Sequence, residues 1–232
     1  MISMSETKYH IQLQDETAYN QSQVTQTSAA YMFTKRCIDI VGSVIGLLIL
    51  LPIIVVLKII YMFGENKGPL LLKQNRIGKN GQVFKIYKFR SMVVNAEERL
   101  KANQALYRKY LANNYKLEPE EDPRITKIGM FLRKSSIDEI PQFINVLKGE
   151  MSLVGPRPVV EEELKEYGSK TPIFLSVKPG VTGYWQVSGR SDVGYPERVD
   201  VELYYVYNQS FMLDIKIIFK TIWIVLLKKG AY

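Results

Sequence analysis

The residues best suited to chemistry in this chain are two adjacent acids, Asp138 and Glu139, in the stretch SSIDEIPQ. A capping box is the structural explanation for them, because Ser136 is followed three residues later by Glu139. That register puts Pro141 at the fifth helical position, where its missing N–H costs a hydrogen bond. With Asp138 as the cap, Pro141 falls at the third position and nothing is lost. We therefore expect Asp138 at a helix N-terminus, where the dipole favours its ionised form and attracts phosphate.

Neighbouring helical residues point in different directions, so the two acids do not share one proton and should have different roles. The single histidine, His10, lies in a polar tail, and Cys37 is the single cysteine. Histidine-based triads and cysteine metal clusters are therefore set aside. Carboxylates among many cations suit phosphoryl transfer, where Asp138 can be a covalent nucleophile and Glu139 a base or Mg²⁺ ligand.

Basic side chains beside Gly/Pro turns supply cations for such a site. The candidates are Lys85, Lys88, Arg90, Arg133, Arg157 between Pro156 and Pro158, and Arg190. Arginine binds phosphate through two-point contacts. The net charge of +8 also suits an anionic partner, which includes nucleic acid, a phosphorylated metabolite or an acidic lipid surface. Charge alone does not choose among them.

Residues 40–57 form an uncharged apolar run that reaches the lower length limit for a membrane span. A buried core helix is the alternative. Pro52 lies inside the run and should kink the helix. Lys and Arg residues flank both ends, so the positive-inside rule gives no asymmetry. We expect a re-entrant helix, broken at Pro52, that enters one leaflet and returns to the cytoplasmic side.

The chain therefore divides into a polar tail (1–32), expected to be disordered, a membrane helix (33–63) and a catalytic domain (64–232). Gly78-Lys79-Asn80-Gly81 predicts a β-hairpin. Together these features predict an α+β protein, mostly helical and membrane-associated, with a small hairpin.

Several helices are expected in the catalytic domain. Residues 94–115 form one, with Leu100, Leu106, Tyr110 and Leu111 buried. Another begins near Thr126, with Ile128, Phe131 and Leu132 facing inward. Ile140, Phe143, Ile144 and Leu147 follow an amphipathic helical period. The acidic stretch 118–122 reads as a solvated loop.

The second half of this domain is expected to alternate loops and helices. Pro158 suits the first position of a short helix over VVEEELKEY. Glycines punctuate PGVTGYWQVSGR into an irregular loop. The C-terminal helix has two interpretations, a core helix or an interfacial helix whose Lys216 and Lys220 reach the membrane surface.

Four stretches resemble the bacterial sugar transferases, the monotopic polyprenyl-phosphate hexose-1-phosphate transferases. They are KRCIDIVGS, KIYKFRSM, DPRITKIGMFLRKSSIDEIPQFINVLKGEMSLVGPRP and PGVTGYWQVSGRS, within a match over about residues 33–232. Ordered blocks with sensible spacing are harder to meet by chance than one short motif. The resemblance implies a re-entrant membrane helix and transfer of hexose 1-phosphate from a UDP-sugar to undecaprenyl phosphate, with release of UMP.

The resemblance also implies roles for individual residues. Asp138 would be the nucleophile that forms a phospho-sugar enzyme, and Glu139 its partner in handling the lipid phosphate and Mg²⁺. Arg133 and Lys88 would lie near the phosphates, and Pro156-Arg157-Pro158 near the nucleotide. Arg90 and Arg190 are weaker candidates for substrate binding. The final Gly230-Ala231-Tyr232 resembles members that start capsule or exopolysaccharide repeat units with glucose or galactose.

Two rival functions remain open from the sequence. In one, the lipid phosphate attacks directly and Asp138 only holds Mg²⁺. In the other, the chain is a basic membrane-anchored binding or scaffold protein. The basic residues accompany glycines, prolines and acids rather than one helix face, which disfavours a nucleic-acid partner. The identity of the hexose depends on one or two hydroxyl contacts, and homo-oligomerisation stays open.

Overall fold

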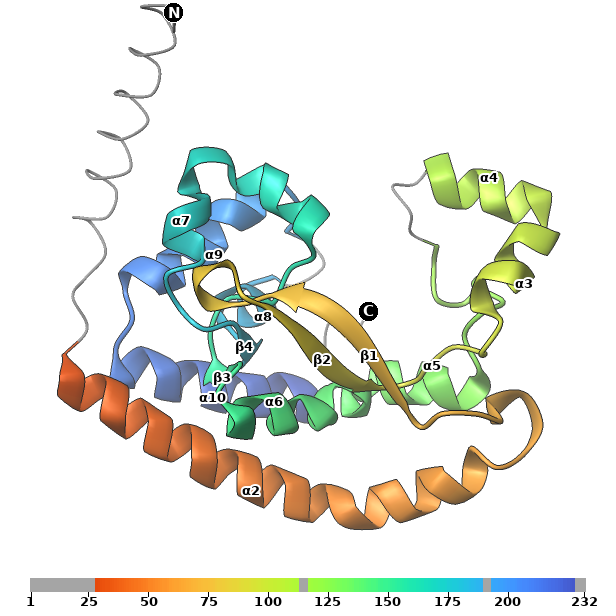
Figure 1. The fold of residues 1–232 in the computed structure, drawn as a ribbon, viewed down its shortest axis with the longest axis horizontal. Helices are drawn as coiled ribbons and strands as arrows, with labels where there is room; N and C mark the ends of the chain where they lie inside the picture. The colour runs from red at the N-terminus through yellow and green to blue at the C-terminus, as the bar shows by residue number, and fades with distance from the viewer. Residues whose placement is uncertain (1–27, 113–116, 190–192, 228–232) are drawn as a thin grey trace, which may run out of the picture.

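The computed structural model describes residues 28–112, 117–189 and 193–227. The described chain is mostly helical, with two small two-stranded sheets. In Figure 1, a long helix, α2 (Ala29–Ile60), runs along one edge of the molecule, and the other labelled elements lie on one side of it. The mostly helical fold with a small hairpin is as predicted.

Helix α2 starts earlier than expected, because Ser28 caps it by accepting a hydrogen bond from the Tyr31 backbone N–H at 3.1 Å. Residues 29–32 of the expected tail are therefore helical, and residues 1–27 lie outside the described residues. The helix continues through Pro52 as one element and curves around the rest of the molecule (Figure 1). Its expected re-entrant course in a membrane stays a prediction.

Most of the apolar surface of α2 is exposed, but one narrow face packs inward. Leu50, Leu57 and the adjoining Tyr61 form a buried cluster with Phe89 and Leu132. By length and composition, α2 is the one helix among the described residues that is suited to cross a membrane. Together these features make α2 a membrane-type helix with a specific contact to the domain.

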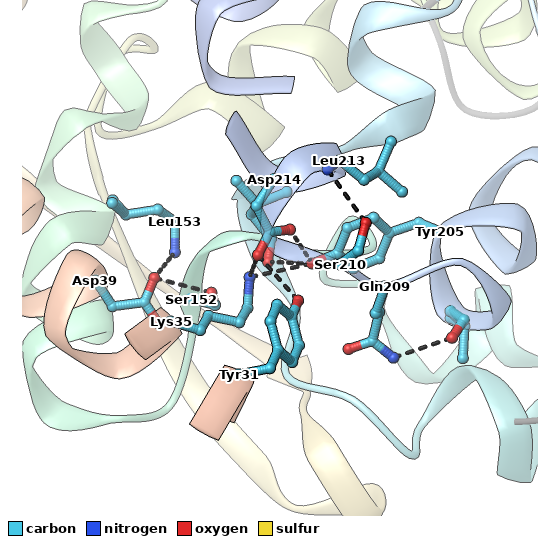
Figure 2. Close-up of polar contacts among 12 residues, drawn as sticks. Tyr31, Lys35, Asp39, Ser152, Leu153, Tyr205, Gln209, Ser210, Leu213 and Asp214 are labelled. Carbon is cyan, nitrogen blue, oxygen red and sulfur yellow. Dashed lines mark hydrogen bonds and ion pairs between the residues drawn. The ribbon is translucent and has the colours of Figure 1, made fainter. Parts of the chain in front are cut away.

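Close to its start, α2 is fixed to the domain by a buried polar cluster (Figure 2). Asp214 accepts hydrogen bonds from Lys35 at 2.7 Å, Tyr31 at 2.9 Å and Tyr205 at 2.7 Å. One turn further along α2, the Asp39 carboxylate accepts from the Leu153 backbone N–H at 2.8 Å and the Ser152 hydroxyl at 2.9 Å. These contacts join α2 to α10 (Phe211–Leu226), α9 (Glu197–Tyr207) and β3 (Ser152–Val154).

The predicted hairpin is confirmed, with β1 (Leu71–Ile77) antiparallel to β2 (Val83–Phe89). Its turn places Asn80 and Gly81 at positive φ, as Asn-Gly allows. Inward residues of β2 are Phe84, Ile86 and Lys88, and their direct partners on β1 are Arg76, Gln74 and Leu72. Cross-strand partners share a face, so Arg76 and Lys88 lie on the same side of the hairpin.

The helix expected over 94–115 is instead two helices, α3 (Ala96–Ala102) and α4 (Gln104–Ala112), interrupted at Asn103. Asn103 interrupts the run because its side chain accepts from the Leu106 backbone N–H, which turns the chain. Leu100 is buried as predicted, but Leu111 is exposed. In Figure 1 these helices project to one side of the molecule, which explains why few of their apolar residues are covered.

Helix α5 (Lys127–Lys134) begins at Thr126 as predicted, because the Thr126 hydroxyl accepts from the Gly129 N–H at 2.9 Å. Leu132 is buried, but the prediction for Phe131 was wrong, since this side chain is 59% exposed. In the loop before α5, Asp122 is buried and paired with Arg124 at 2.7 Å, so this end of the acidic stretch is not solvated.

Helix α6 (Phe143–Lys148) follows, between α2 and the hairpin. Its fully buried residues are Asn145 and Val146, whereas Phe143, Ile144 and Leu147 are half-buried. The amphipathic period misplaces the buried face because α6 is covered on two sides. A Cβ on Gly46 of α2 would lie 2.1 Å from the Phe143 ring, so this glycine permits the close approach.

Two expectations for the second half of the domain need correction. The short helix expected over VVEEELKEY is present as the 3₁₀ helix η4 (Glu161–Lys170), but it does not begin at Pro158, because Val159 pairs with Ile77 of β1. The expected irregular loop contains β4 (Gly180–Thr182) and the short helix α8 (Tyr184–Val187). β4 forms because it pairs in parallel with β3, a partner distant in sequence.

The end of the domain packs η4, α7 (Thr171–Phe174) and α9 around one apolar core. Helix α10 buries Ile217 and Asp214, while its other face exposes large apolar side chains. They are Phe211, Met212, Phe219, Ile222, Trp223, Val225 and Leu226. A core helix does not leave such a face open, which favours the interfacial interpretation.

Candidate active site

The two acids lie in a 3₁₀ helix, η3 (Ile137–Gln142), that continues directly into α6. Asp138 does not cap it, so that prediction was wrong. The cap position belongs to Ser136, whose backbone is left-handed with φ of 55° and whose side chain makes no capping hydrogen bond. The turn out of α5 sets this register, and the tighter 3₁₀ geometry accommodates Pro141. Asp138 is nevertheless in the first turn, as expected.

Apolar packing fixes this acidic turn. Ile137 and Ile140 pack against the cluster formed by α2, Phe89 and Leu132. On the next turn, the Asn145 side chain accepts from the Tyr87 backbone N–H at 3.0 Å and donates to the Lys85 carbonyl at 2.8 Å. Because these bonds join β2 to α6, which continues η3, the inward-facing Lys88 is brought to the acids.

Glu139 is the centre of the charged contacts. Its carboxylate lies 2.7 Å from the Lys88 ammonium and 3.8 Å from a guanidinium nitrogen of Arg157. These groups line one pocket, whose walls include Arg76, Ile86, Lys88, Glu139, Gln142, Arg157, Pro158, Gly180, Val181 and Gln186. The hairpin, η3, the loop after β3 and the segment of β4 and α8 each contribute to it. Four predicted residues, Lys88, Glu139, Arg157 and Pro158, thus meet in a mainly cationic pocket.

Asp138 lies next to this pocket, within the electrostatic reach of Lys88 and Arg133. The pKa of Asp138 is raised to about 6, mainly by burial and also by the neighbouring charge of Glu139, against the opposing effect of the two cations. Arg133 is oriented by donating to the Ser91 hydroxyl at 2.8 Å. A carboxylate with little solvation beside cations is suited to attack a phosphorus atom.

The other predicted binding residues are placed differently. Arg90 is buried and donates to the carbonyls of Pro69, Met92 and Asn66, with its guanidinium over the Tyr61 ring. These contacts tie the end of β2 to the segment after α2, so its observed contacts are structural.

Pro156 is buried, and its carbonyl accepts from the Gly180 N–H at 2.8 Å, which sets the loop that carries Arg157. Arg190 and the terminal Gly230-Ala231-Tyr232 lie outside the described residues.

A buried carboxylate behind the pocket holds the same loop. Glu202 of α9 is fully buried, and its two oxygens accept from the Arg157 backbone N–H at 3.1 and 3.3 Å. Arg198 lies 3.5 Å from Glu202 and stacks over the Trp185 ring. Burial raises the pKa of Glu202 to about 7, against the lowering effects of Arg198 and Arg157.

Sequence analysis did not identify Arg76, Gln142, Gln186 or Glu202. Gln142 closes the SSIDEIPQ stretch itself. For Arg76 a signal was present, because a hairpin register set by Asn80-Gly81 places it on the face of Lys88. Gln186 and Glu202 carried no signal, since only the distant pairing of β3 with β4 and the packing of α9 bring them to the site.

The acidic side chains of this site could provide only part of the coordination shell of a magnesium ion. No group of three acidic, histidine or cysteine side chains gathers within the described ranges. Asp138 and Glu139 therefore offer at most two carboxylates, and Lys88 already pairs with one of them. Mg²⁺ is commonly held by one or two carboxylates together with substrate phosphates and water. The residues present match that kind of site and not an all-protein cage.

Comparison with known proteins agrees with this geometry. The model of the family described as bacterial sugar transferase matches residues 30–228. Undecaprenyl-phosphate galactose phosphotransferase of Salmonella typhimurium is 47% identical over 203 residues, which cover 86% of this chain and 42% of that protein. Exopolysaccharide production protein ExoY of Sinorhizobium fredii is 43% identical, covering 86% of this chain and 88% of ExoY.

Galactosyl transferase CpsE of Streptococcus agalactiae is 46% identical, covering 87% of this chain and 44% of CpsE. The chain therefore spans less than half the length of the Salmonella and Streptococcus relatives but most of ExoY. The similarity covers the membrane-type helix, the hairpin and the acidic turn together.

Proposed function

Because this chain belongs to the bacterial sugar transferase family, we propose that it moves a hexose 1-phosphate from a UDP-sugar to undecaprenyl phosphate and releases UMP. One observation carries the proposal: Lys88 and Arg157 converge on Glu139, beside the half-buried Asp138. That arrangement offers cations for two phosphates and a carboxylate that can attack. The name of the Salmonella relative supplies the lipid carrier and the kind of transfer.

In the first step, an oxygen of Asp138 attacks the β-phosphorus of the UDP-sugar. The bond between that phosphorus and the oxygen bridging to the α-phosphate breaks, and UMP leaves with the electron pair. The product is a mixed anhydride between Asp138 and hexose 1-phosphate. Its formation is supported by the low solvation of Asp138 and by Arg133 and Lys88, which offset the added negative charge.

In the second step, a phosphate oxygen of the lipid attacks the same phosphorus, which forms the lipid diphosphate hexose and frees the Asp138 carboxylate. A covalent intermediate lets the soluble and the membrane substrate react in turn. Magnesium, when bound at Asp138 and Glu139, would neutralise charge on the phosphates. Arg157 would then hold the nucleotide part of the donor while Asp138 is loaded.

The membrane arrangement follows from the two exposed apolar helices. Helix α2 would enter one leaflet and return near Pro52, with α10 at the interface and the pocket facing the cytoplasm. Large exposed side chains on both helices support burial in lipid. In this arrangement the phosphate of the membrane substrate would have to reach the acidic turn.

The product would start a capsule or exopolysaccharide repeat unit. The relatives' names mention galactose and exopolysaccharide production, which favours galactose as the hexose, with glucose as the alternative. A panel of UDP-hexoses, assayed for UMP release with undecaprenyl phosphate in detergent or nanodiscs, tests this. UMP release confined to a UDP-N-acetylhexosamine would contradict the hexose assignment.

A lipid-free exchange experiment separates the covalent route from direct attack by the lipid. A two-step enzyme incorporates labelled UMP into UDP-sugar without any lipid, because the first step is reversible. Direct transfer, with Asp138 only holding Mg²⁺, gives no such exchange. Tight nucleic-acid binding together with no UMP release from any UDP-sugar would instead support a binding or scaffold protein.

A further inference from the structure

Arg76 is the charged residue of the pocket to which neither the sequence motifs nor the proposed mechanism gives a role. It stands on β1 directly across from Phe84, on the hairpin face that also carries Ile86 and Lys88. Cross-strand partners point to the same side, so Arg76 reaches the pocket from the hairpin. Arg157 reaches the same pocket from the loop after β3.

The charges of this pocket do not balance. Arg76, Lys88 and Arg157 line it, against the single carboxylate of Glu139. Burial lowers the pKa of the Arg76 guanidinium, and the positive charge of Arg157 lowers it further, against the weaker opposing effects of the Glu163, Glu139 and Glu162 carboxylates. Two guanidinium groups near each other at a half-buried site are unfavourable unless an anion lies between them. The surplus of positive charge matches a dianionic group such as a diphosphate.

Much of the hydrogen-bonding capacity of Arg76 is unused. Within the described residues, the Arg76 side chain donates hydrogen bonds only to its own strand, to the Asn75 carbonyl at 3.3 Å and to the Gln74 side-chain oxygen at 2.8 Å. No carboxylate of the described chain lies within ion-pair distance of it. A guanidinium has five N–H donors, so donors remain for a two-point contact with phosphate.

Gln186 gives an independent indication that the pocket receives a ligand. Its side-chain oxygen is buried and has no hydrogen-bond partner among the described residues, and the residue lines the same pocket. A buried acceptor without a partner costs free energy, which a ligand N–H or O–H would relieve.

We propose that Arg76 binds the diphosphate of the donor nucleotide, from the side opposite Arg157. This inference rests on the proposed function and extends it, since it assigns the pocket to the UDP group. Arg76 would thereby increase donor affinity and leave the lipid substrate unaffected.

The test uses the full-length protein in nanodiscs with Arg76→Gln and the matched variant Lys73→Gln. Lys73 is on the same strand, but it is exposed and its partner Tyr87 belongs to the other face of the hairpin. Binding of UDP alone, measured by calorimetry, should weaken about 10- to 100-fold in Arg76→Gln and remain unchanged in Lys73→Gln. Arg76→Lys, which keeps the charge but loses the two-point contact, should lie between them.

Kinetics then separate this inference from the proposed function. The donor KM should rise with Arg76→Gln while the KM for undecaprenyl phosphate stays constant. Unchanged UDP binding and donor KM would overturn the role of Arg76 and leave the proposed function intact. A rise confined to the lipid KM would also overturn it, because the site would then bind lipid phosphate. UDP binding that weakens in Arg76→Gln, together with no UMP release by wild type from any UDP-sugar, would leave Arg76 assigned and overturn the proposed function.

Discussion

Lys88 is the cation in closest contact with the acidic turn, at 2.7 Å from the Glu139 carboxylate. Lys88→Gln removes this ion pair and one positive charge near Asp138. We expect UMP release to fall about 10- to 100-fold, because a charge-assisted contact with phosphate is lost. Lys85→Gln is the control, since Lys85 is exposed on the opposite face of the same strand. Equal losses in both variants would contradict the assigned role.

Glu202 predicts a pH-dependent stability. Its pKa is raised to about 7 from an ordinary 4.5, so the folded state holds its proton more tightly than the unfolded state. This group therefore reduces the free energy of unfolding as the pH rises from about 4.5 to 7. The positive charges of Arg198 and Arg157 face Glu202 and lower its pKa, which opposes the effect of burial. The negative charge of Glu202 in turn raises the pKa of the Tyr167 hydroxyl.

The measurement is the melting temperature of Glu202→Gln relative to wild type at several pH values. The neutral amide resembles the protonated acid, so the variant should be close to wild type near pH 5. The melting temperature of the variant relative to that of wild type should rise as the pH increases to about 7 and should then remain constant. A difference between the two proteins that does not change with pH would show that Glu202 does not titrate in this range.

At the residue scale, the sequence predicted the acids and several of their cations from residue type and position. Lys88, Glu139 and Arg157 meet as expected, with Asp138 beside them. The prediction that Asp138 caps the helix was wrong because it assumed an α-helix, in which Pro141 would cost a hydrogen bond. The chain instead forms a 3₁₀ helix there. Local hydrogen-bond counting does not distinguish these two geometries.

Among the elements, α5 depends on one glycine for its position. A Cβ on Gly129 would lie 1.8 Å from the Ser91 carbonyl oxygen, so the helix contacts the segment after β2 directly. Gly129→Ala should therefore displace α5 and destabilise the fold by about 1 to 3 kcal/mol. Gly194→Ala is the matched control, because a Cβ there meets nothing within 4 Å. Equal thermal stability of the two variants would refute this close packing.

The elements that the sequence predicted have local causes. The hairpin follows from Asn80-Gly81, and α5 begins at the side-chain cap of Thr126. Elements that form only through contacts with residues distant in sequence were missed. Strand β4 is the example, because it forms by pairing with β3. Phe131 was assigned to the core by its helical period, but membrane-type proteins also expose apolar side chains.

At the scale of the whole molecule, the polar cluster in Figure 2 holds α2 against the domain. Lys35→Met leaves the buried Asp214 without its cation, which should cost about 3 kcal/mol of stability. Lys170→Met is the control, because its pair with Asp200 is exposed and should contribute less than about 1 kcal/mol. Chemical denaturation in nanodiscs measures both, and similar small losses would show that the cluster does not anchor α2.

The account depends most on Asp138 as the covalent nucleophile. The direct measurement is transfer of label from a UDP-sugar, labelled in its β-phosphate, to the protein in the absence of lipid. Wild type should become labelled and lose the label to added undecaprenyl phosphate. Asp138→Asn, nearly isosteric, should acquire none while still binding UDP. Covalent label on Asp138→Asn would contradict the account.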